Sequence, residues 1–235
     1  MECFYDLHIH SCLSPCADDD MTPCNIVNMA ILNELDIIAV TDHNSTGNCP
    51  AVVAAAEGTG LLIVCGMELC TAEEVHVLCF FESLSAAMAF GELVKTRLPY
   101  VENNPAIFGN QIIMGEQDEP QGEAAGLLSA ATDISISELS GLTAEFCGVC
   151  VPAHIDKTSY SVFSNLGFLP PDFPFGTAEV ARKARYEMIC EKNPELAAKK
   201  RIYSSDAHSL HLIKERENSL ELKEKTAACV IETLK

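Results

Sequence analysis

Short apolar runs recur along this chain, and several of them end abruptly in histidine or carboxylate side chains. The clearest examples read LDIIAVTDH, LLIVCGMEL and CGVCVPAHID, and the chain opens in the same way with CFYDLHI. Continuous apolar runs of this length are typical of strands that are buried on both faces, as in parallel sheets. A chain built on such strands must cover both faces of its sheet with other elements, and this requirement points to an α/β fold.

Helical patterns separate these runs. Thr22 and Pro23 have the residue types expected at the cap and the first turn of a helix, and an apolar stripe follows them up to Leu35. Residues 100–135 are polar and rich in turn residues, and we expect a strand or hairpin with a surface excursion there. Repeated strand–helix units over 235 residues predict one barrel-like α/β domain spanning residues 1–235.

Composition sets the broad class. Hydrophobic residues make up 48% of the chain, which is enough for a large core, and no apolar run is long enough for a membrane span. The N-terminal residues MECFYDLH lack the features of a secretory signal. Many of the twelve cysteines lie inside apolar runs, as reduced cysteines do when they act as small hydrophobic residues. We therefore expect a cytoplasmic protein without membrane contacts.

The formal net charge of −19 bears on the partners. A surface this acidic repels a phosphate backbone, so the sequence predicts that long nucleic acid is not a partner. Acidic residues gathered in one cleft need not repel an anion, because bound divalent cations neutralise them and allow the cleft to accept a small anion. The expected partner is therefore a small phosphorylated substrate.

The histidines are concentrated at the ends of the predicted strands. Four of the seven fall at or just beyond such ends, and His8 lies two residues before one of them, His10. Residues i and i+2 of a strand point to the same face, so His8 and His10 should project together, with Leu7 and Ile9 on the other side. Because the carboxyl ends of barrel strands converge, these side chains should meet and form a metal site.

Six motifs follow one another from residue 6 to residue 209, namely DLHIHS, VTDHNS, GMEL, EVHVLCFF, VPAHID and SSDAHS. In this order they resemble the motifs of the PHP (polymerase and histidinol phosphatase) family of metal-dependent phosphoesterases. The resemblance implies a distorted seven-stranded β/α barrel of the TIM-like, PHP type. It also implies up to three divalent metal ions in the cleft, with zinc, manganese or iron as the candidates.

Carried over motif by motif, the resemblance implies three ligand sets. The first ion would be held by His8, His10, Glu68 and Asp206. The second would share Glu68 and add His76 and His154. The third would take His43, His208 and an acidic residue after the first motif, for which the sequence favours Asp18, with Asp20 as the runner-up. Cys12 and Cys16 are near enough in sequence to be soft ligands, but the family pattern does not need them.

The same resemblance implies hydrolysis of a small phosphate ester or short nucleotide by a hydroxide that the metal centre activates. The expected catalytic residues are Asp206, His208 and Glu68. Lys157 is expected to bind substrate, and Arg182 and Arg185 are further cations near the site. Alternatives are a histidinol-phosphatase-like phosphomonoesterase, an amidohydrolase of C–N bonds, and a non-catalytic metal or nucleotide sensor.

Overall fold

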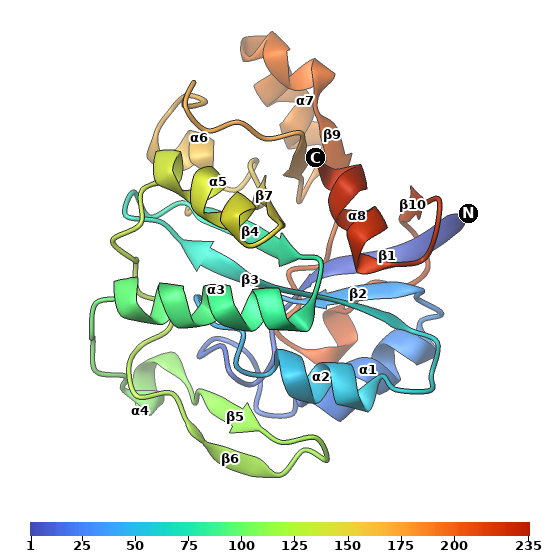
Figure 1. Ribbon diagram of the computed structural model, residues 1–235. Coiled ribbons are helices and arrows are strands. Elements are labelled where there is room, and N and C mark those ends of the chain that lie inside the picture. The colour runs from blue at the N-terminus through green and yellow to red at the C-terminus, as the bar shows by residue number, and fades with distance from the viewer.

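The computed structural model describes residues 1–235, and a curled six-stranded sheet forms its centre (Figure 1). The strand order is β10-β1-β2-β3-β4-β7. The strands span Glu2–Ile9 (β1), Ile37–Val40 (β2), Leu62–Cys70 (β3), His76–Phe81 (β4), Gly148–Pro152 (β7) and Ser219–Glu221 (β10). Strands β1, β2 and β3 are parallel, whereas β4 is antiparallel to both β3 and β7, and β10 is antiparallel to β1.

Eight α-helices surround or flank the sheet. They span Pro23–Leu32 (α1), Cys49–Ala55 (α2), Leu84–Arg97 (α3), Pro105–Phe108 (α4), Ile136–Glu145 (α5), Val162–Asn165 (α6), Lys183–Lys192 (α7) and Ala227–Leu234 (α8). Thr22 caps α1 by accepting a hydrogen bond from the backbone N–H of Asn25, and Pro23 occupies the first turn, as the sequence predicts. No helix combines the length and the apolar character that a membrane span requires.

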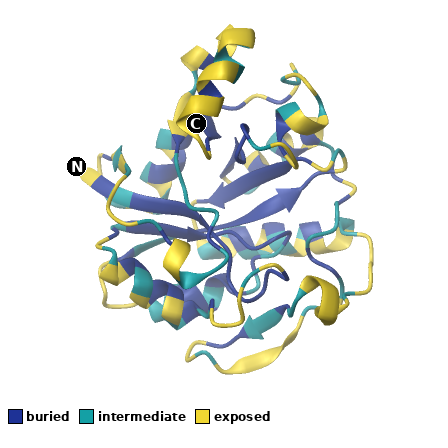
Figure 2. Ribbon diagram, turned by 180° about the vertical axis from the view of Figure 1, so that it is seen from behind, coloured by how far each residue is buried: buried dark blue, intermediate teal, exposed yellow.

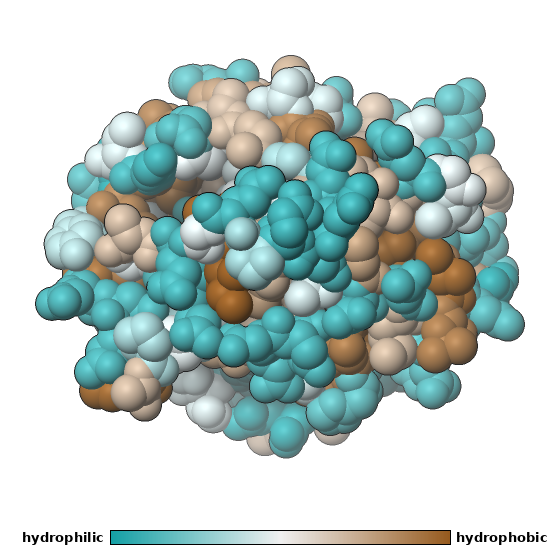
Figure 3. Space-filling model, turned by 90° about the horizontal axis from the view of Figure 1, so that it is seen from below, coloured by the Kyte–Doolittle hydropathy of each residue, from teal (hydrophilic) through white to brown (hydrophobic).

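Two small strand pairs complete the fold. The hairpin of β5 (Ile112–Met114) and β6 (Pro120–Glu123) lies at the bottom of Figure 1, within the segment where a hairpin is expected. The parallel pair of β8 (Thr177–Glu179) and β9 (Lys200–Ile202) precedes the C-terminal elements. Seen from below, the molecule is mostly hydrophilic, and its hydrophobic side chains are scattered in small groups (Figure 3).

The strands of the central sheet are mostly buried (Figure 2), and their side chains pack on both faces of the sheet. One face, which we call the inner face, carries a cluster to which β1, β2, β3, β4, β7 and β9 all contribute and against which α8 packs. The outer face of β3 and β4 packs on α3 and α5 in a second cluster. A third cluster joins β1 and β2 to α1 and α2. Contributions from so many strands to one inner cluster are typical of a sheet that curls toward a barrel.

The expected α/β class is confirmed, but a continuous seven-stranded barrel is not formed. The β8–β9 pair is a separate sheet, and side chains cross the gap between β9 and β1. The backbone N–H of Leu7 donates to Ser204 Oγ at 3.2 Å, and that of Tyr203 donates to the Tyr5 hydroxyl at 3.2 Å. The N-terminal half of β1 pairs with β10, so that part of β1 is not free to pair with a further barrel strand.

The sheet also contains antiparallel strand pairs where the sequence predicts parallel ones. Only residues 71–75 connect β3 to β4, and so short a link cannot hold a crossover helix. The two strands therefore form an antiparallel pair, with Glu68 opposite Leu78 and Cys70 opposite His76. Glu68 lies on the same face of β3 as Val64, and His76 lies on the same face of β4 as Leu78. Both side chains therefore project from the inner face at the same end of the curled sheet.

Candidate metal centre

The C-terminal end of β1 supplies His8 and His10, which are both fully buried. A register shift between Asp6 and Ile9 interrupts the pairing of β1 with β2. Leu7 consequently packs in the inner cluster and Ile9 in the cluster with α1, so the expectation that these two share a face is wrong. The two histidines still converge, with 3.1 Å between His8 Nε2 and His10 Nε2.

Glu68 lies at the centre of the site and is 1% exposed. Five imidazoles surround its carboxylate, with nitrogen–oxygen distances of 3.4 Å for His8, 3.5 Å for His10, 3.1 Å for His43, 3.0 Å for His76 and 3.1 Å for His154. Burial alone would raise the pKa of Glu68, but the neighbouring histidines, His76 and His8 foremost, hold it well below its usual value. The carboxylate is therefore charged and able to serve two cations at once.

Asp206 approaches the same histidines from the segment after β9. Its Oδ1 lies 3.3 Å from both His8 Nε2 and His10 Nε2, and its Oδ2 pairs with the ammonium group of Lys157. Burial opposes ionisation, but His8 and His10 outweigh it and lower the pKa of Asp206. Its φ of 55°, like the φ of 27° at His154, is unusual for a residue with a side chain. Both ligand candidates thus sit on backbone that the fold holds in a rare conformation.

Three groups of side chains bring their potential ligand atoms within 4.8 Å of one another. They are His8–His10–Glu68, His43–Glu68–His76 and His10–His43–His208. Neither Asp18 nor Asp20, the acids expected in the third set, joins any of these groups, and both are exposed. Asp18 is tied to the site only through its backbone N–H, which donates to His208 O at 2.9 Å.

Outer carboxylates and hydroxyls hold the histidines in place. Glu179 on β8 accepts hydrogen bonds from His8 Nδ1 at 2.9 Å and from the backbone N–H of His154 at 2.9 Å. His10 Nδ1 lies 2.9 Å from Ser14 Oγ, and that hydroxyl donates to Asp42. With Nδ1–H engaged by Glu179, Nε2 is the His8 atom that faces the cluster.

Sequence reasoning missed Glu179. Its only signal is a lone carboxylate inside the short apolar stretch GTAEVA. A buried charge there needs a partner, and the structure supplies His8, whose Nδ1 lies 2.9 Å from Glu179 Oε2.

The donor set fits divalent metal ions. Two imidazole nitrogens bound to one ion at 2.0–2.1 Å in tetrahedral geometry lie about 3.3 Å apart, close to the separation of His8 and His10. His43 Nδ1 is buried without a hydrogen-bond partner, although it lies 3.1 Å from Glu68 Oε2. Burial and the neighbouring His43 ring hold the pKa of His10 well below its usual value, which favours the neutral, metal-binding imidazole.

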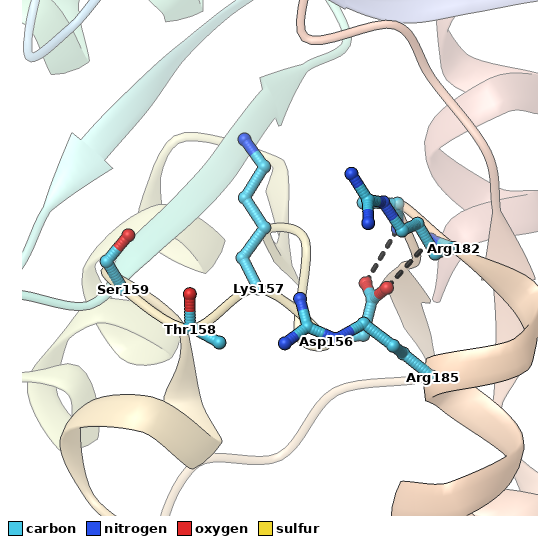
Figure 4. Close-up of a pocket in the computed structure, with 7 residues that line it drawn as sticks. Asp156, Lys157, Thr158, Ser159, Arg182 and Arg185 are labelled. Carbon is cyan, nitrogen blue, oxygen red and sulfur yellow. Dashed lines mark hydrogen bonds between the residues drawn. The ribbon is translucent and has the colours of Figure 1, made fainter.

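A small cavity of about 130 Å³ opens onto this centre, and it is lined by ligand candidates together with Lys157, Ser159 and Tyr160. A neighbouring cavity of about 230 Å³ shares Lys157 and Ser159 and adds Arg182 and Arg185 (Figure 4). We call this neighbour the cationic pocket. Asp156 shapes it by accepting hydrogen bonds at 2.7 Å from the backbone N–H groups of Ala181 and Arg182.

Comparisons with known proteins agree with this geometry. A family model described as the PHP domain matches residues 6–203. No curated protein matches the sequence. Among solved structures, the endonuclease Q of Pyrococcus furiosus, described as lesion-specific, is 20% identical with a TM-score of 0.69 over 100% of this chain. A Bifidobacterium adolescentis protein, provisionally named a metal-dependent phosphoesterase, is 18% identical with a TM-score of 0.58, and 87% of each chain is covered.

A second endonuclease Q structure corrects one expectation. It holds a 27-mer duplex with an abasic lesion at the active site, and it is 19% identical with a TM-score of 0.65 over 99% of this chain. The exclusion of long nucleic acid, which rested on net charge, is therefore wrong: charge at a cleft is local, and here Lys157, Arg182 and Arg185 gather beside the acidic centre. This chain spans 56% of the length of both endonuclease Q chains.

Proposed function

Because this chain belongs to the PHP domain family, whose members and structural relatives include metal-dependent hydrolases, we propose that it is a phosphoesterase with a di- or trinuclear metal centre. The observation that carries the proposal is the position of Glu68. Its carboxylate belongs to two of the three ligand groups, His8–His10–Glu68 and His43–Glu68–His76. A carboxylate shared in this way suits a bridge between two ions, which is the arrangement that phosphoryl-transfer sites use.

We assign the ligands as follows. His8, His10, Glu68 and Asp206 would hold one ion, and Glu68, His76 and His154 the second. His43 belongs to the group with Glu68 and His76 as well as to the group with His10 and His208, and with His208 it would hold the third ion. Imidazole and carboxylate ligands suit zinc, manganese and iron(II), and the mixture here favours no single one of them.

Divalent ions bound there would supply a hydroxide nucleophile at neutral pH and would neutralise the charge of the phosphoryl oxygens. The remaining work falls to side chains of this chain. The Lys157 ammonium group is half-buried beside Asp206, and although burial opposes its charge, Asp206 raises the pKa of Lys157. Lys157 therefore stays cationic and would orient the phosphoryl group by donating to one of its oxygens. Asp206 lines the same cavity and would accept or return a proton.

The cationic pocket supports an anionic substrate. A phosphoryl group at the metal centre would leave the rest of an ester directed toward Arg182 and Arg185, which suits a second phosphate or another anionic group. These cations favour phosphate esters over the uncharged amides that a C–N hydrolase would accept. Small phosphate esters, short nucleotides and the DNA substrate that endonuclease Q binds all carry the required charge.

The test is a substrate screen on protein loaded with manganese, zinc or iron(II). p-Nitrophenyl phosphate, its bis-ester, mononucleotides and an abasic-site duplex would be compared for product release. The matched control is His211→Ala, because His211 is exposed and lies in none of the ligand groups. We expect hydrolysis of at least one phosphate ester that is lost in Glu68→Gln and kept in His211→Ala. A metal-loaded protein that hydrolyses no ester, or a Glu68→Gln variant with full activity, would contradict the proposal.

A further inference from the structure

The third ligand group differs from the other two because it contains no carboxylate. His10, His43 and His208 gather there, and the rings of His10 and His208 stack with centroids 4.2 Å apart. The carboxylates near these histidines are those of the first two sites: Glu68 lies beside His43 Nδ1, and Asp206 lies beside His10 Nε2. A further anion on the Nε2 side of His43 would balance the charge of a third ion, and the loop that follows β1 offers both acids and a cysteine.

Among the acids of this loop, only Asp19 forms a side-chain hydrogen bond, and its partner is not a histidine. The Asp19 carboxylate accepts hydrogen bonds from Asn110 Nδ2 at 2.8 and 3.0 Å, and the Asp20 backbone carbonyl accepts one from Asn25. Asp18, Asp19 and Asp20 are all exposed. None of them has a side-chain contact with the histidines of the third group.

Cys16 makes the contact that the acids do not make. Its Sγ lies 3.2 Å from His43 Nε2, on the ring whose Nδ1 faces Glu68. The loop presents it there through successive turns, in which the backbone N–H of Ser14 donates to Ser11 O and that of Ala17 donates to Ser14 O. The downstream end of the loop is fastened to the site by the hydrogen bond from Asp18 N to His208 O.

The separation of Cys16 and His43 is close to that of two ligands on one ion. With metal–sulfur and metal–nitrogen bonds of about 2.3 and 2.0–2.1 Å, tetrahedral geometry places the two ligand atoms about 3.5 Å apart. A shift of a few tenths of an ångström would bring them to that value. A thiolate also supplies the negative charge that the three imidazoles lack.

We propose that Cys16, rather than Asp18 or Asp20, is the anionic ligand of the third metal site, together with His43 and His208. The inference rests on the metal centre of the proposed function and specifies the chemistry of one of its sites. A thiolate favours zinc, iron(II) or cobalt(II) over manganese or magnesium, so this position selects a softer ion than a carboxylate would. Neither Cys16 nor the other exposed cysteine, Cys147, belongs to the three ligand groups, but only Cys16 contacts a histidine, so Cys147 provides a matched control.

The experiment uses the full chain in three forms, which are wild type, Cys16→Ser and Cys147→Ser. After removal of metal, each protein is titrated with cobalt(II), and the near-ultraviolet thiolate-to-cobalt charge-transfer band is recorded with the metal content. We expect the band in wild type and Cys147→Ser and its loss in Cys16→Ser, which should bind about one ion fewer. Circular dichroism checks that each variant is folded, and Cys16 is exposed, so its replacement should leave the fold intact.

A further variant, Cys16→Asp, tests selectivity. It should restore the lost ion while shifting the zinc-to-manganese preference of that site by roughly tenfold or more, since even outer partners of a metal ligand change affinity by roughly 10- to 100-fold. A charge-transfer band of equal strength in Cys16→Ser, or an unchanged preference in Cys16→Asp, would overturn the assignment of Cys16 alone. Failure of the wild type to bind any metal would overturn the proposed metal centre itself.

Discussion

Glu179 and His8 meet across the fold, with 2.9 Å between Glu179 Oε2 and His8 Nδ1, although they are 171 positions apart in the sequence. Both side chains are almost completely buried. Burial alone would lower the pKa of His8, but Glu179, together with Asp206 and Glu68, raises it well above its usual value. The contact fixes the imidazole with Nε2 toward the cluster, so Glu179 positions a ligand candidate.

Glu179→Gln should weaken metal binding while the protein stays folded. The amide oxygen can still accept from His8 Nδ1, but the negative charge that makes the imidazole a stronger ligand is lost. We expect the affinity for the first metal ion to fall roughly 10- to 100-fold, measured by competition with a chelating indicator. Glu191→Gln is the control, because Glu191 is exposed on α7. An unchanged affinity in Glu179→Gln would show that the contact is purely structural.

Glu68→Gln should lose more metal than His208→Ala. Glu68 takes part in two ligand groups, whereas His208 takes part in one and is more exposed. Elemental analysis of reconstituted protein should therefore show at least two ions missing in the first variant and about one missing in the second. Equal losses in the two variants would contradict a bridging role for Glu68.

Replacing Arg182 and Arg185 together by alanine should separate two kinds of substrate. Both side chains line the cationic pocket, but neither lines the cavity at the metal centre. We expect KM to rise roughly tenfold for a substrate with a second phosphate, because loss of one charge-assisted contact weakens binding by about 1.5–3 kcal/mol. KM for p-nitrophenyl phosphate should be unchanged.

Lys157→Ala is compared with the double arginine variant, because Lys157 lines both the cationic pocket and the cavity at the metal centre. It should lower kcat/KM for both substrates, by roughly 100-fold if the ammonium group stabilises the developing charge. The same loss for both substrates in the double arginine variant would show that the cationic pocket is not a separate subsite.

Tyr5 should make stability depend on pH in the alkaline range. Burial raises the pKa of Tyr5 to about 12, above the ordinary value of 10.0 that the unfolded chain would show. The folded state thus holds the proton more tightly, so this contribution is complete below pH 10 and is lost as the pH rises from 10 to about 12. The shift corresponds to about 2–3 kcal/mol of unfolding free energy.

Tyr5→Phe is the control for this titration. It cannot ionise, so its unfolding free energy, measured in urea without metal, should fall less steeply between pH 10 and 12 than that of wild type. At pH 8 it should be less stable by about 1 kcal/mol, because the backbone N–H of Tyr203 loses its acceptor. Parallel pH profiles for the two proteins would contradict the assignment.

The sequence by itself determined the local elements and most of the candidate ligands. Continuous apolar runs predict the buried strands, and the N-terminal cap of α1 at Thr22 and Pro23 depends only on neighbouring residues. A carboxylate such as Glu68 at the end of an apolar run stands out because an unpaired buried charge is costly. The residues that the motifs single out at the strand ends, His8, His10, His43, His76 and Glu68, do come together.

Only the tertiary structure decided how the strands close and what surrounds the ligands. Side chains of Ser204 and Tyr5 cross the gap between β9 and β1 in place of a strand ladder. No local sequence pattern predicts that these two strands stay unpaired. The approach of Glu179 to His8 and of Cys16 to His43 depends on how distant segments pack. Sequence spacing favours Asp18 as a ligand, whereas the packing of the loop brings Cys16 Sγ to 3.2 Å from His43 Nε2, a contact that positions along the chain do not predict.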